Sequence, residues 1–421
     1  MQPEFYSHSS FMRVSQVHIT DLSLTNFRNY ARLELNMPPG MIVLYGDNAQ
    51  GKTSLLEAVY YLATSRSPHS TSDRQLINWL AASDPIPFAR LVADVKARLG
   101  TKRVEMTLLQ EVQGRAERFK KEIRINGVSK RVMDLLGQIT VVMFLPQDLS
   151  LVEGPPTLRR RYLDITLCQT DSQYCHALTQ YTKVLTNRNA LLRQLQERGG
   201  RGDASQLEFW DEKLAQYGAV VVAGRNHLVS ELERGAERIH HDLSGSHEHL
   251  RLRYQPGFDA AVKVVGQMAF NPGDLGTAAL PQLPPTEVAE RFAEQLKGHR
   301  REDILRGQTS IGPQRDEMRF LVNGRDLGLY GSRGQNRTAV LALKLAELEW
   351  MREKTSEWPV LLLDEVAAEL DTHRRGYLLE RVNQAEQVML TTTEPYLLPQ
   401  EYLKDAVKWR VESGTISISE S

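Results

Sequence analysis

The sequence predicts an α/β fold in which a sheet domain is interrupted by an inserted α-helical arm. Strand-like segments occur at both ends of the chain, and long helical patterns fill its middle. A glycine-rich octet near the start separates an apolar strand from a helix. We therefore expect the first half of the sheet domain at residues 13–165, the arm at 166–300 and the second half at 301–421.

The composition is that of an ordinary soluble globular protein. The chain has 421 residues, of which 41% are hydrophobic and 25% charged, enough for two or three domains. Its longest apolar runs, at 141–145 and 360–363, are strand-sized, so we expect no membrane span. Residues 1–16 lack an apolar core followed by a cleavage site, which favours a cytosolic protein. Met12 is an alternative start, because the first clear strand pattern follows it.

Cysteine and histidine give two candidate clusters. Cys168 and Cys175, the two cysteines of the chain, lie seven apart on one face of a predicted helix and are expected to be reduced and buried. A second cluster spans a Gly/Ser break and consists of His240, His241, His247 and His249. It is either a metal site or a solvated loop, and the break favours the loop.

The first half begins with strands. Residues 17–27 and 30–37 alternate with period two, whereas 41–45 are continuously apolar, as in a strand covered on both faces. A helix is expected from Lys52, with apolar residues of its first turns facing inward. More strands are expected between residues 88 and 145.

The pattern becomes helical near Asp171. One helix is expected around 181–196 and another around 209–239, separated by the breaker 199–203, so that they form an antiparallel hairpin. Residues 271–286 are rich in Pro and Gly and read as a linker. A helix at 287–298 and strands at 318–324, 360–365 and 387–393 complete the second half.

The glycine-rich octet fits the pattern G-x-x-x-x-G-K-[ST]. It consists of Gly46, Asp47, Asn48, Ala49, Gln50, Gly51, Lys52 and Thr53. In such loops backbone N–H groups face phosphates, and the positive end of the following helix points at them. Lys52 is expected to contact the β- and γ-phosphates of ATP, and Thr53 to bind Mg²⁺.

A buried strand in the second half ends in two carboxylates. The apolar run that starts at Val360 leads into Asp364 and Glu365. Ligands of open α/β sheets bind beyond the carboxyl ends of strands. We expect Asp364 to hold the Mg²⁺ ion through its water shell and Glu365 to activate the attacking water.

Ser332 and Gln335 admit two interpretations. Locally they form a capping box, since Ser332 can cap a helix and Gln335 follows three residues later. The segment also resembles the ABC signature motif S-x-G-Q, with Gly334 at its glycine. In ABC proteins that motif contacts the γ-phosphate bound to a second subunit. The resemblance therefore implies an ATP-dependent homodimer.

The separation of Lys52 from Ser332 by a helical module resembles the ABC/SMC branch of ATPases, and six segments resemble the RecF family within it. They are 26–30, 46–58, 148–164, 312–317, 331–338 and 361–371. The resemblance implies an ABC-type ATPase head that dimerises on ATP and binds double-stranded or gapped DNA. It implies a role in recombinational repair, in which the protein helps to load recombinase together with RecR- and RecO-like mediator proteins.

The same resemblance assigns three further positions. Gln147 lies where the Q-loop side chain of such heads reaches Mg²⁺. Asp371 corresponds to the D-loop at the dimer interface, and Thr391–393 to the switch position. A transport ATPase would need a membrane partner, and a nuclease-linked ATPase would need an acidic domain after the head. The inserted hairpin and the six segments that resemble the RecF family argue against a transport ATPase, so we favour the DNA-binding ATPase.

Charge is distributed unevenly although the formal net charge is zero. Residues 96–131 contain eleven Lys/Arg and four Asp/Glu, whereas residues 342–421 contain nine and fifteen. This asymmetry indicates either a basic DNA-binding face or charges that alternate along solvated strands.

Overall fold

A parallel sheet at the centre of the molecule is built from both ends of the chain. The structure is a computed structural model that describes residues 17–81, 85–97, 100–113, 116–199, 203–260 and 284–418. Met12 and most of the 199–203 and 271–286 segments lie outside these residues. The strand order is β15–β14–β3–β13–β12–β8, parallel except for the β14–β15 pair. These strands are β3 (Gly40–Tyr45), β8 (Val141–Phe144), β12 (Val360–Asp364), β13 (Gln387–Thr392), β14 (Val407–Glu412) and β15 (Thr415–Ile418).

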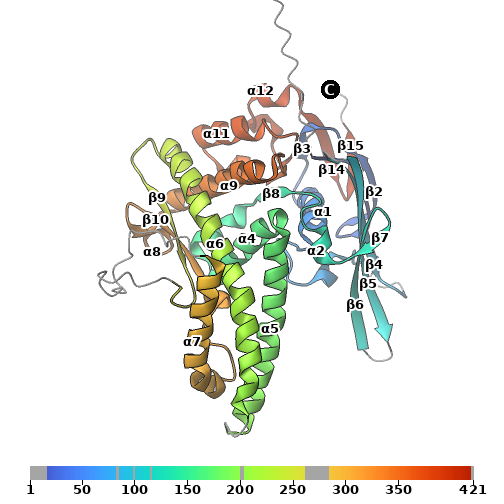
Figure 1. The fold of residues 1–421 in the computed structure, drawn as a ribbon. Coiled ribbons are helices and arrows are strands. Elements are labelled where there is room, and N and C mark those ends of the chain that lie inside the picture. Colours follow the sequence, from blue (N-terminus) through green and yellow to red (C-terminus); the bar gives the residue numbers. More distant parts are fainter. Residues whose placement is uncertain are drawn as a thin grey trace, which may run out of the picture.

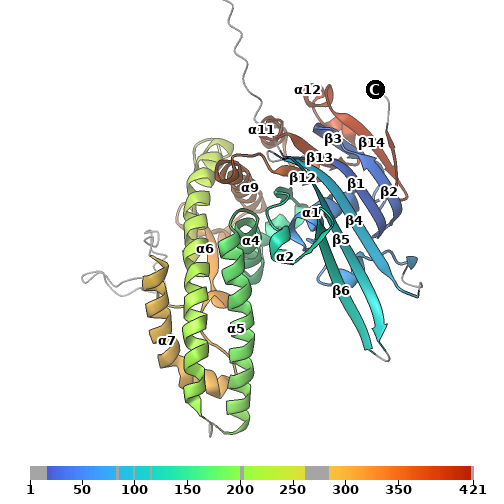
Figure 2. The same ribbon diagram turned by 45° about the vertical axis from the view of Figure 1, so that its right-hand side comes forward.

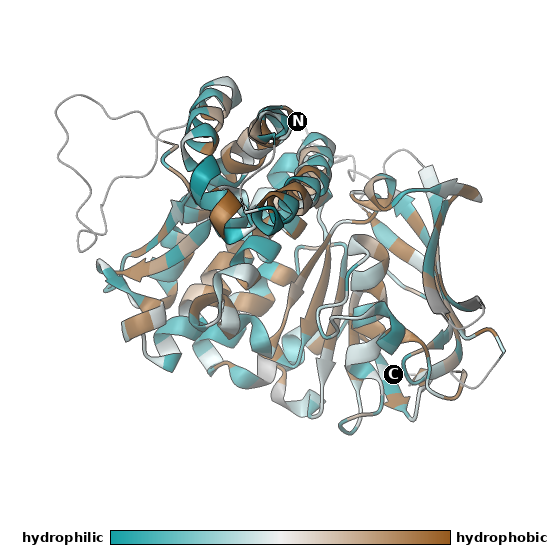
Figure 3. Cartoon of the chain, turned by 90° about the horizontal axis from the view of Figure 1, so that it is seen from below, coloured by the Kyte–Doolittle hydropathy of each residue, from teal (hydrophilic) through white to brown (hydrophobic). Residues whose placement is uncertain are grey.

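Both faces of this sheet are covered, which explains its continuously apolar strands. On β3, Ile42 and Leu44 enter one hydrophobic core, whereas Met41 and Val43 enter another. The strands at the middle of the molecule are correspondingly coloured as hydrophobic in Figure 3. Helix α1 (Lys52–Thr64) covers the first face and α9 (Arg333–Thr355) packs on the second.

An antiparallel sheet lies on the far side of α1 (Figure 2). Its order is β2–β1–β4–β5–β6–β7. The strands are β1 (His18–Phe27), β2 (Tyr30–Asn36), β4 (Phe88–Ala97), β5 (Gly100–Gln113), β6 (Ala116–Ile125) and β7 (Val128–Lys130). The short helix η1 (Asp73–Leu76) precedes β4, and α2 (Val132–Leu135), η3 (Pro146–Leu149) and α3 (Ser150–Glu153) come after β7.

The helical arm extends away from the sheets (Figure 1). It contains α5 (Ser172–Glu197), α6 (Leu207–Leu243) and α7 (Pro285–Arg306), preceded by α4 (Pro156–Thr170). Asp171 begins α5 by accepting a hydrogen bond from the backbone N–H of Tyr174. Helices α5 and α6 pack along each other, as the hairpin pattern predicted. The short η4 (Ala204–Gln206) leads into α6.

A three-stranded sheet and several helices complete the second half. The sheet order is β11–β10–β9, with β9 (Leu250–Gln255), β10 (Glu317–Val322) and β11 (Arg325–Asp326). The helices are η5 (Pro313–Arg315), α8 (Leu327–Tyr330), α10 (Val366–Glu369), α11 (Thr372–Val382), η6 (Pro395–Leu397) and α12 (Gln400–Leu403).

Buried charges join the arm to the rest of the molecule. Arg225 of α6 donates to Asp164 of α4 at 2.9 and 3.0 Å and to Asp316 at 2.7 Å. Burial raises the pKa of Asp316, and Arg225 opposes that rise. Because an unpaired buried charge is costly, these interactions fix α6 relative to α4 and the start of β10.

Two expectations about side chains were wrong in part. Cys168 and Cys175 are both buried and free, but they lie on different helices, because Asp171 ends α4 and caps α5. The loop interpretation fails for His240, which is fully buried in the last turn of α6, whereas His247 and His249 are exposed. Among the described residues, no group of three His, Cys, Asp or Glu could hold a metal. Within the same residues, no helix is long and apolar enough to cross a membrane.

A second buried cluster holds the three arm helices together. Arg188 of α5 is fully buried and donates to Asp211 of α6 and Asp303 of α7, both at 2.7 Å. It also donates to Thr309 at 2.8 Å. One guanidinium thus compensates two buried carboxylates on neighbouring helices.

We predict that Arg188→Met lowers the free energy of unfolding by roughly 3–5 kcal/mol, because it leaves the buried Asp303 carboxylate without its paired cation. Asp211 keeps a second partner, Arg300, at 2.6 Å. Chemical denaturation measures the loss. The matched control is Arg234→Met, which removes an exposed pair with Glu231 on α6 and should cost less than about 1 kcal/mol. Equal losses for the two variants would contradict a structural role for the Arg188 cluster.

Candidate functional site

Three neighbouring parallel strands end at one edge of the central sheet. β3 leads into the glycine-rich octet, β12 ends at Asp364, and β13, which lies between them, ends at Thr392. The strands run in the same direction, so their carboxyl ends meet. This edge is where open α/β sheets bind ligands.

Glycines are required at two positions of the octet. Gly46 has a φ of 145°, and a Cβ there would lie 2.3 Å from the carbonyl oxygen of Val411. Gly51 has a φ of 120°, and its Cβ would lie 2.5 Å from the Asn29 side chain. Both values lie in the region of φ that side chains rarely adopt. Within the described residues, no side chain caps α1 after Gly51, so its first N–H groups face the loop.

The side chains of Asn29 and Tyr30 stabilise the loop through hydrogen bonds to its backbone. The Asn29 amide donates to the carbonyl oxygen of Gln50 at 2.8 Å, and the Tyr30 hydroxyl to that of Gly51 at 2.9 Å. Gln50 Oε1 in turn accepts the backbone N–H of Ser413 at 2.7 Å. Residues from both ends of the chain therefore fix the shape of the loop.

Lys52 lies inside the loop. Its side chain is 4% exposed, and Nζ donates to the carbonyl oxygens of Gly46 and Asp47, both at 2.8 Å. Nζ also lies 3.6 Å from Glu365 Oε1. Lys52 Nζ therefore contacts the octet through two carbonyl oxygens and the second half of the chain through Glu365.

Asp364 is the second point at which the two halves meet. Its Oδ1 accepts the hydroxyls of Thr53 at 2.9 Å and of Thr391 at 2.8 Å. Asp364 is buried, with 5% of its surface exposed. The Thr391 Oγ1 also accepts the backbone N–H of Glu365 at 2.9 Å, which fixes the turn after β12.

Glu365 occupies that turn. Its φ of 53° is left-handed, which is uncommon for a residue with a side chain. The side chain is 38% exposed, in contrast to buried Asp364. Neighbouring residues therefore present one buried and one accessible carboxylate at the same edge.

The site fits a nucleoside triphosphate with Mg²⁺. The uncapped N-terminus of α1 and the Lys52 amine provide the positive groups that phosphates require. The Thr53 hydroxyl and the Asp364 carboxylate supply oxygen ligands, the kind that Mg²⁺ prefers.

Gln147 contacts a residue that the sequence did not single out. Its Nε2 lies 2.9 Å from Nδ1 of His69, beyond α1. The adjacent Asp148 faces Lys344 and Glu347 of α9. Burial raises the pKa of Asp148 to about 6, and Lys344 opposes that rise.

The Ser332–Gln335 segment begins α9, and both halves of the capping box form. Gln335 N donates to Ser332 Oγ at 3.2 Å, and Ser332 N donates to Gln335 Oε1 at 3.0 Å. Ser332, Arg333 and Gly334 are exposed, whereas Gln335 is half-buried. The side-chain hydrogen bonds of Ser332 and Gln335 stay within the segment or go to Glu248, and none of those described reaches the octet. The segment does not join the Lys52 site of its own chain.

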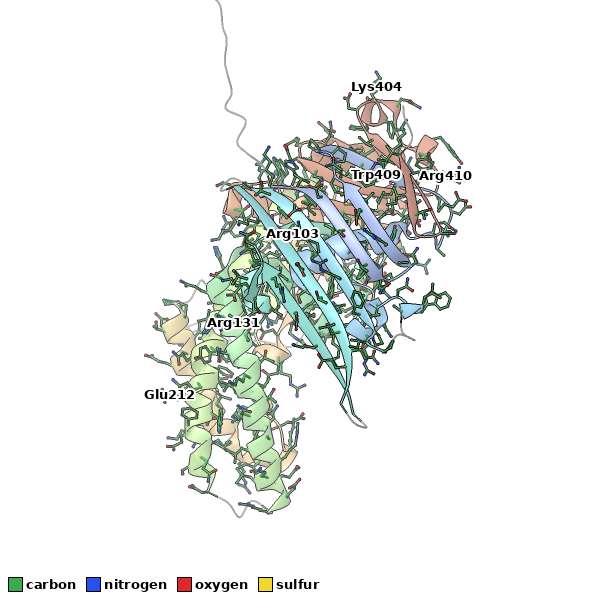
Figure 4. The ribbon with its side chains drawn as sticks, turned by 90° about the vertical axis from the view of Figure 1, so that its right-hand side faces the viewer. Arg103, Arg131, Glu212, Lys404, Trp409 and Arg410 are labelled. Atoms are coloured by element: carbon green, nitrogen blue, oxygen red, sulfur yellow. The ribbon has the colours of Figure 1, made fainter. Side chains whose placement is uncertain are left out.

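The basic segment of residues 96–131 presents mostly paired cations. Arg103 lies on the sheet face turned to the viewer in Figure 4. It donates to Asp94 at 3.1 Å, and Lys120 lies 2.5 Å from Glu122. Lys121 is held by Asp73 at 2.8 Å and is only 18% exposed. Charges of both signs therefore occur together on this sheet, whose Lys96, Arg124 and Lys130 are also exposed.

The arginine run at 159–161 is structural. Arg159 forms a bidentate pair with Glu317 at 2.6 and 2.7 Å. Arg160 donates to the carbonyl oxygen of Asp316 at 2.7 Å, and Arg161 to that of Ser67. These arginines anchor α4 and are engaged within the chain.

Sequence reasoning identified the octet and the Asp–Glu pair but not the groups that hold them. Asn29 and Tyr30 lie within residues 26–30, one of the six segments that resemble the RecF family. The resemblance assigned no role to either residue. The short polar turn between β1 and β2 is the signal that could have found them. No local signal points to His69, because its pairing with Gln147 depends on folding.

Comparisons with known proteins agree along nearly the whole chain. The family model of the RecF/RecN/SMC N-terminal domain matches residues 18–413. DNA replication and repair protein RecF of Chloroflexus aurantiacus is 40% identical over 408 residues, which cover 95% of this chain and 99% of the relative. The RecF of Roseiflexus castenholzii is 42% identical over 413 residues, covering 94% and 99%.

Solved structures give the same result. The recombination mediator protein RecF with ATP, of the RecFOR pathway, superposes with a TM-score of 0.80 at 30% identity, covering 97% of this chain and all of that one. The complex of RecF with ATPrS gives 0.79 at 31% identity, with the same coverage. The predicted ABC-type ATPase head with an inserted α-helical arm is thereby confirmed. The chain belongs to the RecF family of ABC/SMC-type ATPases.

Proposed function

We propose that this chain is an ATP-dependent DNA-binding protein of recombinational DNA repair, which binds ATP with Mg²⁺ and hydrolyses it slowly as a switch. One observation carries the nucleotide part. The Thr53 hydroxyl and the Asp364 carboxylate, 311 positions apart, meet at 2.9 Å beside the buried Lys52 amine. The solved relatives in complex with ATP and ATPrS support the same assignment.

Each side chain of the site has a role in this proposal. Lys52 exchanges its two carbonyl acceptors for the β- and γ-phosphates, and the N-terminus of α1 holds the same phosphates. Thr53, Asp364 and Gln147 would hold Mg²⁺, which would supply positive charge to the phosphate oxygens. Glu365, exposed at the same edge, orients the attacking water and accepts its proton.

The signature segment acts on a second subunit. Ser332 Oγ accepts from Gln335 N, and its own O–H stays available to donate. Gly334 leaves open space at the helix end, since a Cβ at this position would lie no closer than 3.9 Å to its nearest neighbour. We propose that this end meets the nucleotide held by Lys52 of another copy, so that ATP joins two heads in a homodimer.

DNA and mediator proteins complete the proposal. ATP-dependent dimers bind double-stranded or gapped DNA and help to load recombinase, working with RecR- and RecO-like proteins. The exposed cations Lys96, Arg124 and Lys130 of the antiparallel sheet are the proposed ligands of the DNA phosphates. Support comes from the relatives, which are named for DNA replication and repair and for the RecFOR pathway.

We predict that Lys52→Met weakens ATP binding at least tenfold. A hydrogen bond to a charged group contributes roughly 1.5–3 kcal/mol, and methionine offers no charge to the phosphates. Equilibrium binding of a fluorescent ATP analogue measures the loss. Lys52→Arg, which retains the charge, should bind more tightly than Lys52→Met. Wild-type affinity and turnover in Lys52→Met would rule out the phosphate-loop assignment.

We predict that Ser332→Arg leaves ATP binding by the monomer intact but prevents ATP-dependent dimerisation and hydrolysis, because the bulky cation blocks closure. Ser332→Ala is the control for capping alone and should cost about 1 kcal/mol of stability. Mixing Ser332→Arg with Lys52→Met should restore part of the ATPase activity, since one composite site of the mixed dimer then carries neither defect. A folded Ser332→Arg protein with normal dimerisation and turnover would refute the signature assignment.

We predict that Lys96, Arg124 and Lys130, changed together to Glu, weaken binding to all DNA sequences alike. The slope of the logarithm of affinity against that of salt concentration should flatten by about 0.9 for each phosphate that the variant no longer neutralises. The control reverses three exposed cations elsewhere, Lys297, Lys354 and Lys404, with the same change in net charge. Equal losses in both triple variants would show that net charge alone, and not this sheet, governs DNA binding.

A further inference from the structure

The side chain of Gln335 has a partner outside its own helix. Its Nε2 donates to Oε1 of Glu248 at 2.7 Å. Glu248 lies on the segment that returns from α6 to β9, which residues 244–249 form. The end of the helical arm therefore touches the start of the signature helix α9 directly.

This hydrogen bond fixes which way the Gln335 amide points. A carboxylate accepts hydrogen bonds only, so it selects the NH₂ end of the amide. The carbonyl end, Oε1, then faces the backbone N–H of Ser332, which donates to it at 3.0 Å. Both hydrogen bonds are satisfied in this one orientation. Glu248 thus completes the capping box that presents the Ser332 hydroxyl.

Contacts of two kinds fix the position of Glu248: backbone hydrogen bonds of its neighbour His249, and the nearby His240 ring. His249 N donates to Asn323 Oδ1 at 3.0 Å, and Asn323 N donates back to the His249 carbonyl oxygen at 3.1 Å. On the other side, Nε2 of the fully buried His240 lies 3.7 Å from Glu248 Oε2. The Glu248 side chain is 24% exposed and is held between these elements.

We propose that Glu248 is a positioning residue for the signature segment: it orients Gln335, and through it Ser332, for contact with the nucleotide of a second copy. This inference rests on the proposed ATP-dependent dimer. It assigns the end of the arm a direct part in forming the composite site. Glu248 acts through Gln335 and touches no nucleotide itself.

The test compares Glu248→Ala with Glu248→Gln in the full-length chain. Sedimentation velocity with Mg²⁺ and the slowly hydrolysed analogue ATPγS measures dimerisation. Glu248→Ala should raise the dimer dissociation constant about tenfold, because Gln335 then lacks the acceptor that orients it. Glu248→Gln keeps an acceptor oxygen and should restore most of the affinity. Nucleotide binding, measured at protein concentrations where the chain is monomeric, should not change in either variant.

Glu237→Ala is the matched control. Glu237 lies on α6 near the same end of the arm and is 30% exposed. It pairs with Arg251 at 3.1 Å and lies 3.9 Å from His249 Nδ1, and neither of these contacts is with the signature segment. Its removal changes the net charge by the same amount and should leave dimerisation unchanged. Thermal unfolding of all three variants separates loss of the Glu248–Gln335 hydrogen bond from loss of the fold.

The outcomes distinguish the inference from the proposed function. Normal dimerisation of Glu248→Ala, while Ser332→Arg stays monomeric, overturns the role of Glu248 and leaves the dimer standing. A defect in Glu248→Gln as large as in Glu248→Ala also overturns it, since charge would then matter instead of the oriented hydrogen bond. If Ser332→Arg also dimerises normally, the proposed dimer is wrong.

Discussion

The site depends on the interleaving of strands from the two ends of the chain. β13 pairs with β3 on one side and with β12 on the other. Without it, the glycine-rich octet and Asp364 would lie on unconnected strands. The Thr391 hydroxyl at the end of β13 donates to the same carboxylate oxygen as the Thr53 hydroxyl, so the middle strand fixes the spacing of its neighbours. The site can therefore form only when both halves have folded together.

Two ionic clusters fix the inserted arm: one connects its three helices, and the other connects it to the rest of the molecule. Arg188 ties the three arm helices to one another, and Arg225 ties α6 to α4 and to Asp316. Buried ion pairs add little net stability over apolar packing, but they penalise every arrangement in which a charge loses its partner. We interpret the clusters as specifying one orientation of the arm and one geometry of the signature helix beside it.

The sequence predicted the elements of the fold better than the interactions between them. The octet and the apolar strand ending at Asp364 carry their signal locally, since backbone conformation and burial dictate the residue types. The helix break at Asp171 was missed because the seven-residue spacing of Cys168 and Cys175 fits one helix face, whereas the Asp171 side chain ends that helix and caps the next. The pairing of Gln147 with His69 joins positions 78 apart, and no period or motif encodes such a pair. Likewise, the capping box at Ser332 was readable, but its link to Glu248 exists only in the folded chain.

Helix α6 is one unbroken rod of 37 residues, about 55 Å long at 1.5 Å per residue. Arg225, near the middle of this helix, pairs with the half-buried Asp164 and the buried Asp316, whereas one end of α6 reaches the arm tip and the other leads to Glu248. Helix α6 also packs directly on the signature helix α9, where a Cβ at Gly235 would lie 3.0 Å from Ala346. The arm tip and the signature helix are therefore joined through one continuous element, and a kink in α6 would break that continuity.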